Sequence, residues 1–236
     1  MPTLVQPGPK YLQLGNTARI SRVLQLSNSA VNAEGAALRL STMCTVQSGL
    51  SLRTGLEISD EGVLAVQSGD LEPGRLLDPP TARIASNGIA QRHLIGLGDV
   101  LFKSRGVRHG AWAVSVELKE PAVAIMPLFV LRPLADVVDA GYLAWFLNQQ
   151  PAEQHFAQGA TGTTVRIVNK PILESLEVTL PPLETQRKIG SLALCAATER
   201  NLIERISGRR YELLNRQLAD LVNNFAHSHM NERPHT

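Results

Sequence analysis

The feature that most constrains this chain is a long stretch near its C-terminus, residues 183–225, that contains no proline. Apolar residues recur there at spacings of three or four, with Glu and Arg between them. This periodicity predicts one continuous amphipathic helix. Its 43 residues, at a rise of about 1.5 Å each, would make a rod of about 65 Å, too long for one small domain to cover. The rod therefore needs a partner helix, in the same chain or in another.

One face of this predicted helix supplies candidate dimerisation residues. Glu199 and Arg210 lie on that face, so the seam is not a strict apolar heptad repeat. We expect the helix to extend to residue 226 and residues 227–236 to form a disordered tail. The residues expected to pair with a second helix are Ile189, Leu192, Ala196, Ile203, Ile206, Leu213 and Leu221.

The middle of the chain, residues 38–182, has a different texture and predicts a strand-rich domain. Gly or Pro interrupts it about every ten residues, and the short runs between them are rich in Val, Ile and Leu. One helix is expected over residues 139–148, with an acidic start and a stop at Pro151. The expected fold class is α+β: a curved, strand-rich domain with a few helices, then a long helix that forms a coiled coil. The expected strands are residues 62–67, 99–102, 111–116, 122–126 and 128–131.

Composition restricts the classes of function. The net charge is only +2 and charged residues make up 19% of the chain, so binding to nucleic acid would need locally concentrated charge. No apolar run reaches the roughly 18–20 residues that a membrane span needs, and the N-terminus does not resemble a signal peptide. We expect a cytoplasmic protein without membrane association. Cys44 and Cys195 are far apart in sequence, and we expect each to be a small buried residue.

Positive charge is concentrated between residues 83 and 119, where the local net charge is +4, whereas residues 43–80 carry −4. Within the basic segment a short apolar strand ends in Lys103, Ser104 and Arg105, and a glycine-flanked loop with Arg108 and His109 follows. Lys and Arg on such a loop can reach phosphates, and Arg can also read guanine edges. The alternative interpretation is a solvated hairpin tip.

A second candidate segment, residues 159–167, combines glycines with hydroxyl side chains. Thr161, Thr163, Thr164 and Arg166 could hold a phosphate, because small residues allow the backbone N–H groups to approach it. The segment lacks the final Gly-Lys-Ser/Thr of a nucleotide-binding loop, so nucleotide hydrolysis is not expected. An ordinary turn is the alternative.

The sequence contains two patterns that are similar to parts of catalytic or metal sites. Residues 77–81 resemble the Asp-Pro-Pro-aromatic loop of amino-methyltransferases but lack the aromatic residue that would stack on a flipped base. The histidines at 227, 229 and 235 have no acidic or thiol partner nearby in sequence. We therefore expect a binding protein with no catalytic residues, no cofactor and no metal.

Four stretches, in this order, resemble one target-recognition domain and spacer helix of a type I restriction–modification specificity subunit. The segment over residues 98–106 is the most recognisable of them. Typical members of that family carry two recognition domains and two spacers, whereas this chain carries one of each, and residues 1–37 match nothing that we can place. The four stretches are residues 45–51 with 63–74, residues 98–106, residues 142–148 leading to 159–164, and residues 178–189.

The resemblance implies a role. A curved sheet would place loops in the DNA major groove, with DNA-reading loops at Lys103 to His109 and at Thr161 to Arg166. The spacer helix would pair antiparallel with another and set the distance between half-sites. A homodimer would recognise an interrupted palindrome. The expected partners are double-stranded DNA, a DNA methyltransferase subunit and, in some systems, a restriction subunit.

Three other functions are alternatives to a specificity subunit. The first is a stand-alone DNA-binding regulator, and the second is a protein-interaction adaptor with a coiled-coil helix. The third, an enzyme that uses Asp78 or Asp99, has no supporting nucleophile–base pattern.

Overall fold

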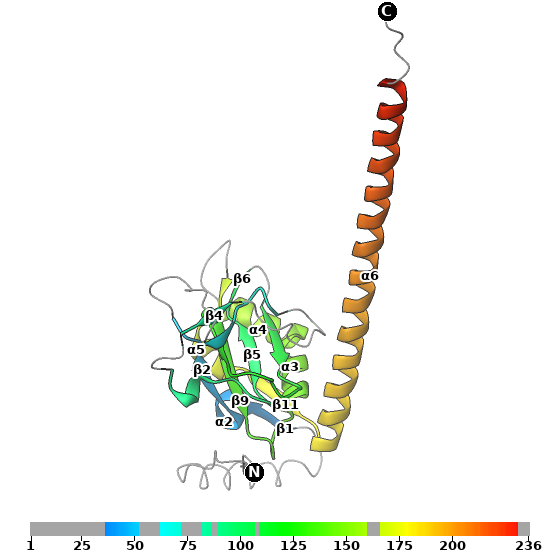
Figure 1. The fold of residues 1–236 in the computed structure, drawn as a ribbon. Coiled ribbons are helices and arrows are strands. Elements are labelled where there is room, and N and C mark those ends of the chain that lie inside the picture. Colours follow the sequence, from blue (N-terminus) through cyan, green and yellow to red (C-terminus); the bar gives the residue numbers. More distant parts are fainter. Residues whose placement is uncertain are drawn as a thin grey trace, which may run out of the picture.

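The computed structural model describes residues 36–51, 62–71, 82–85, 89–106, 109–159 and 166–230. A strand-rich globular part is followed by one long helix that projects beyond it (Figure 1). The expected α+β class and long C-terminal helix are confirmed. Residues 1–35, the Asp-Pro-Pro segment and the side chains of the tail histidines lie outside the described residues.

Two main sheets form the globular part. One has the strand order β2–β9–β5–β7, all antiparallel, and the other has the order β4–β3–β8, in which β3 and β8 are parallel. The bounds of these strands are β2 (Cys44–Ser48), β3 (Val63–Val66), β4 (Arg83–Ile84), β5 (Val100–Lys103), β7 (Gly110–Ala113), β8 (Ala122–Ala124) and β9 (Leu128–Pro133).

The apolar strands are explained by burial on both faces. In β5, Val100 and Phe102 face a core shared with the helices, whereas Leu101 faces a second core between the two sheets. In β3, Leu64 contributes to the core between the sheets and Val63 to a third cluster on the outer face. Because successive side chains point to opposite faces, a strand buried on both sides is a continuous apolar run.

Shorter elements surround the sheets. The strands β1 and β11 pair antiparallel, and so do β6 and β10. The bounds of the remaining elements are β1 (Ala36–Arg39), α2 (Leu40–Met43), η1 (Gln91–His93), β6 (Arg105–Gly106), α3 (Ala140–Leu147), α4 (Gln150–Gly159), β10 (Arg166–Ile167), α5 (Lys170–Ser175), β11 (Glu177–Leu180) and α6 (Leu183–Met230).

The predicted helix over residues 139–148 is confirmed as α3. The side chain of Asp139 accepts a hydrogen bond from the Tyr142 N–H at 2.9 Å and so caps the helix. The expected stop at Pro151 is only half right, because α4 begins at Gln150 directly after α3 ends. Proline is tolerated in the first turn of a helix, where its missing N–H would have no partner.

The start of α6 packs on α3. Gln186 is only 2% exposed: its side-chain oxygen accepts from the Asp139 N–H at 3.0 Å, and its amide donates to the carbonyls of Pro181 and Val137. One turn later Gly190 meets Gly141. A Cβ at Gly190 would lie 2.7 Å from the Tyr142 nitrogen, so the helices cross at glycine-to-glycine distance.

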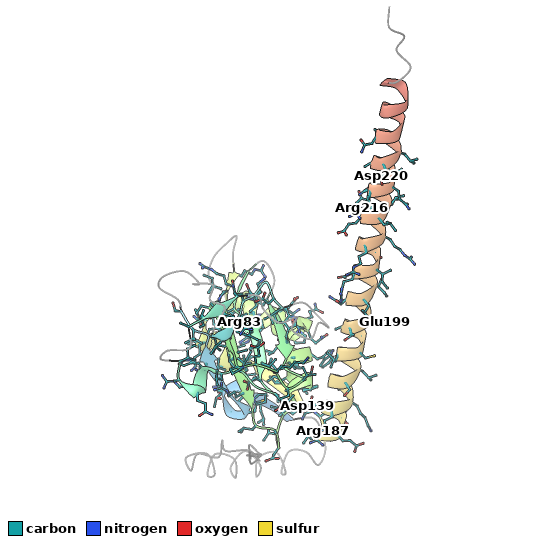
Figure 2. All side chains as sticks on the ribbon, in the orientation of Figure 1. Arg83, Asp139, Arg187, Glu199, Arg216 and Asp220 are labelled. Carbon is teal, nitrogen blue, oxygen red and sulfur yellow. The ribbon has the colours of Figure 1, made fainter. Side chains whose placement is uncertain are left out.

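Beyond residue 201, α6 leaves the globular part, and the side chains of residues 202–223 are exposed (Figure 2). The helix begins at the predicted Leu183 and reaches Met230, four residues beyond the predicted end at residue 226. None of the helices in the described part of the chain has the length and apolar character that a membrane span requires.

Candidate nucleic-acid interface

The structure brings parts of the two predicted DNA-contacting segments side by side. Strand β6 pairs antiparallel with β10, so that Arg166 lies opposite Gly106 and Ile167 opposite Arg105. The backbone N–H of Val168 extends this contact by donating to the Ser104 carbonyl at 2.9 Å. The ribbon lies at the end of the globular part that points in the same direction as the C-terminal end of α6 (Figure 1).

Arg105 and Arg166 are the exposed cations of this ribbon. Arg166 pairs with Gly106, the neighbour of Arg105, and directly paired residues point to the same face of a ribbon. Because successive residues of a strand point to opposite faces, Arg105 and Arg166 project from opposite faces of the ribbon. Gly106 adopts φ +150°, a backbone conformation that side-chain-bearing residues rarely take. We call this pair of strands the arginine ribbon. It offers guanidinium groups on both faces and little bulk at the glycine.

The base of the ribbon is firmly held. Lys103 ends β5, which is paired on one side with β9 and on the other with β7. Ser104 is 4% exposed, and both its N–H and its hydroxyl donate to the Pro127 carbonyl, at 3.0 and 2.6 Å. The structure thus corrects the interpretation of Ser104 as a DNA contact: its polar groups fix the chain just before the ribbon.

His109 is also turned inward. Its ring stacks on Phe102 and meets Phe156 edge-on, with ring centroids 5.9 and 5.8 Å apart, and its Nδ1 lies 3.2 Å from the Lys103 carbonyl oxygen. Its Nε2 is buried without a hydrogen-bond partner among the described residues. Burial lowers the pKa of His109 below its usual value; the contact with the Lys103 carbonyl and the charge of Glu153 oppose this shift, and the charges of Arg166 and Lys103 add to it. This packing opposes the predicted role of His109 in touching bases.

Four of the predicted contacts fall outside the part of the chain that the structure describes. Arg108, Thr161, Thr163 and Thr164 lie outside the described residues. They flank the arginine ribbon in sequence: Arg108 follows β6 closely, and the threonines precede β10. Their roles stay predictions.

A polar network centred on Arg132, which we did not single out from sequence, supports the neighbouring part of the sheet. The Arg132 guanidinium donates to the carbonyls of Arg92 and Leu94, both at 2.8 Å, and to the Gln47 side-chain oxygen at 3.0 Å. It also lies 3.5 Å from a carboxylate oxygen of the buried Asp99. The network ties the η1 segment to strands β2 and β9.

Asp99 has a structural environment. One carboxylate oxygen faces Arg132, and the other accepts from the Gly96 N–H at 2.9 Å. Burial raises its pKa, and the Gly96 hydrogen bond and Arg132 oppose that shift. This arrangement weakens the alternative of an enzyme built on Asp99. Within the described ranges, no three His, Cys, Asp or Glu side chains gather as a metal site would need.

The predicted dimerisation residues fall into two groups on α6. Ile189 is partly buried against the core of its own globular part, which corrects its interpretation as a seam residue. The other six are exposed, with Leu192 at 71% and Leu221 at 65%. These six residues are Leu192, Ala196, Ile203, Ile206, Leu213 and Leu221.

The two cysteines differ in burial. Cys44 is buried as expected, but Cys195 is exposed, which corrects the expectation of two buried cysteines.

Comparison with known proteins identifies similar solved structures. No family model matches the sequence, and no curated protein matches it. The chain is 20% identical to an HsdS subunit from Thermoanaerobacter tengcongensis (TM-score 0.49, 78% of this chain and 46% of that one). It is 15% identical to a type I restriction–modification S subunit from M. genitalium (TM-score 0.48, 76% and 44%).

A third solved structure carries the fold assignment. It concerns complex assembly and conformational transition of the type I restriction–modification system, and it matches with a TM-score of 0.53 at 20% identity over 85% of this chain and 51% of that one. Our chain thus spans about half the length of the solved chains that it matches. The protein has the fold of about half of a type I restriction–modification chain, as the sequence resemblance predicted.

Proposed function

We propose that this chain is a sequence-specific DNA-recognition subunit that directs a partner DNA methyltransferase, and a restriction subunit where one is present, to a bipartite site. The observation that carries the proposal is the pairing of β6 with β10, which joins Arg105 and Arg166 on one ribbon. The shared fold with a type I restriction–modification chain supports the assignment of this ribbon to DNA.

The chemistry of the arginine ribbon suits a duplex. Each guanidinium offers five N–H donors, which can form paired hydrogen bonds with phosphate oxygens or with guanine edges in the major groove. Neither Arg105 nor Arg166 forms an ion pair with another described residue. Both are therefore free to exchange water for an anionic ligand.

A bipartite target needs two recognition units, and the exposed face of α6 supports pairing with a second copy of this chain. Large apolar side chains line the projecting part of the helix, and a row of exposed apolar side chains of this size is typical of a protein–protein interface. The exposed large apolar residues of α6 are Leu192, Leu194, Leu202, Ile203, Ile206, Tyr211, Leu213, Leu214, Leu218, Leu221 and Val222.

Selection of duplexes from a random library, followed by affinity titration at several salt concentrations, tests DNA recognition. We expect one enriched, interrupted motif and a linear fall of log affinity with log salt. Arg105→Ala or Arg166→Ala should reduce the slope by about 0.9 per copy, hence about 1.8 for the homodimer, if that arginine contacts one phosphate, or relax one base position in each half-site if it reads a base. Arg205→Ala, an exposed change on α6, is the charge-matched control. Salt-independent or absent duplex binding by the wild-type chain would refute the proposal.

Co-purification tests the partner. Expressed together with a type I methyltransferase subunit, the chain should form a complex that methylates the selected motif. Specific DNA binding without such a complex would instead support the stand-alone regulator.

A further inference from the structure

We propose that two copies of α6 pair antiparallel in one defined register, in which Glu199 of each copy faces the partner's Arg210. This inference rests on the homodimer of the proposed function and on the antiparallel pairing that the family resemblance implies, and it goes beyond both by fixing the register. The observations that carry it are an exposed seam on α6 and the positions of the two charges within that seam.

The seam is open and faces away from the globular part. Gln186, Gly190 and Asn201 are buried on the side of α6 toward that part. At about 100° per residue, Ile203 and Ile206 project from the other side of the helix. A shallow hollow on α6 overlaps the seam and extends along one flank of it; it is lined by Ser191, Leu194, Cys195, Thr198, Glu199, Leu202, Ile203 and Ile206. A second helix can therefore lie along the seam without meeting the first globular part.

The seam follows a heptad spacing of four and three. Its central positions are Glu199, Ile203, Ile206 and Arg210, so two charges enclose two isoleucines. Among the described residues, neither Glu199 nor Arg210 has an ion-pair partner. A charge at a seam position is unfavourable in a helix pair unless it meets an opposite charge. At this spacing the seam is Leu192, Ala196, Glu199, Ile203, Ile206, Arg210, Leu213 and Gln217, and the predicted Leu221 lies one residue beyond its next position, Asp220.

An antiparallel pair with its two-fold axis between residues 204 and 205 places every seam residue opposite another seam residue. Glu199 then faces the partner's Arg210, and Ile203 faces the partner's Ile206. Ala196 faces the partner's Leu213 in the same way. By symmetry the ion pair forms twice, on either side of an apolar centre.

Other alignments leave the charges unpaired. A parallel, in-register pair stacks Glu199 on the partner's Glu199, and Arg210 on the partner's Arg210. A shift of the antiparallel pair by one heptad places Arg210 against the partner's Ile206 in one direction, and Glu199 against the partner's Ile203 in the other. The charges thus select one orientation and one register, as isolated polar seam residues do in coiled coils.

The register fixes where the two globular parts attach to the rod. Gly190 and the partner's Gly190 would lie roughly 44 Å apart along the axis, at 1.5 Å per residue. This separation is of the order of one turn of DNA, about 34–36 Å, and would contribute to the spacing of the half-sites.

Distances between spin labels test the register in the intact chain. Labels on Glu204→Cys and Asn215→Cys, each in a Cys195→Ser background, lie off the seam on the same side of α6. The proposed register predicts axial separations between copies of roughly 2 Å at residue 204 and roughly 32 Å at residue 215. One-heptad shifts predict axial separations of roughly 21 or 42 Å at residue 215, and a parallel pair predicts equal distances at both sites, with no axial separation at either. Either of those results would overturn the register.

Charge exchange provides a second readout. Glu199→Arg should weaken the dimer about a hundredfold, because symmetry creates two like-charge contacts of about tenfold each. Adding Arg210→Glu should restore most of the affinity. Glu204→Arg, with the same charge change off the seam, is the control. In a parallel pair, Glu199→Arg would merely replace one like-charge contact with another, and unchanged affinity would refute the register. A wild-type monomer in light scattering would instead remove the homodimer from the proposed function, whereas a dimer with the wrong distances would refute only the register.

Discussion

Replacing Gly190 with alanine tests how α6 is attached to the globular part. A Cβ at this position would lie 2.7 Å from the Tyr142 nitrogen, 2.8 Å from the Asp139 Oδ1 and 2.9 Å from the Gly141 carbonyl carbon. Two of these neighbours are backbone atoms, and the third is the carboxylate oxygen that caps α3. The overlap can therefore be relieved only by separating the two helices or by breaking the cap.

The sign of the effect follows from two opposing terms. Alanine in a helix interior is favoured over glycine by about 1 kcal/mol. Overpacking costs about 1–3 kcal/mol, and loss of an N-cap about 1 kcal/mol more. The expected net result of Gly190→Ala is a loss of about 1–3 kcal/mol in the free energy that holds the start of α6 on α3.

Gly208 provides the matched control, because a Cβ there meets nothing within 4 Å. Gly208→Ala should stabilise α6 by up to about 1 kcal/mol. Hydrogen exchange measured on peptides from α3 and α6 separates the two effects: Gly190→Ala should speed exchange around residues 183–193, and Gly208→Ala should slow it around residue 208. If both variants slow exchange, the close crossing of α3 and α6 is wrong.

Three further predictions follow from single contacts. Burial lowers the pKa of His109, so below about pH 6.5 the unfolded state takes up a proton that the folded state does not bind, and acid destabilises the fold. His109→Phe should therefore reduce the fall of the urea midpoint between about pH 7.5 and 5.5. An unchanged pH dependence of the midpoint would count against this burial. Gln186→Leu leaves the Asp139 N–H without its partner and should lower the free energy of unfolding by about 1–3 kcal/mol in urea titrations, unless that group finds water. Asn148→Ala leaves the N–H and carbonyl of Ala111 unpaired and should lower the melting temperature, with faster exchange confined to β7 if only that edge opens.

The secondary-structure elements that could be predicted from sequence are those whose pattern of apolar residues depends on one local property, such as burial on both faces or a helical period. Strands β3, β5, β8 and β9 lie within the predicted runs or overlap them closely, because burial on both faces makes the buried part of each strand a continuous apolar run. Helix α6 begins at the predicted Leu183, because its seam keeps a helical period over many turns. Each pattern is local, so the tertiary fold did not need to be known.

The arginine ribbon shows why the candidate site was only partly predicted. Strands β6 and β10 have two residues each, too few for any periodicity, and their partners are far apart in the chain. Proximity of the two segments therefore depends on the sheet and not on local sequence. The inward positions of Ser104 and His109 likewise depend on tertiary partners, the Pro127 carbonyl and the Phe102 ring. A polar residue that is satisfied by a distant carbonyl has no signature in its own neighbourhood.

Helix α3 connects the arginine ribbon to α6. At its end, the Asn148 side chain accepts from the Ala111 N–H at 3.0 Å and donates to the Ala111 carbonyl at 2.8 Å, and so holds the edge strand β7 that pairs with β5 next to the arginine ribbon. At its start, Asp139 and Gly141 meet Gln186 and Gly190 of α6. The ribbon is thus connected to the rod through one short helix bonded at both ends. If the rod sets the distance between two half-sites, it can do so only because this connection fixes the ribbon relative to α6; a hinge at this point would let the same dimer accept many spacings.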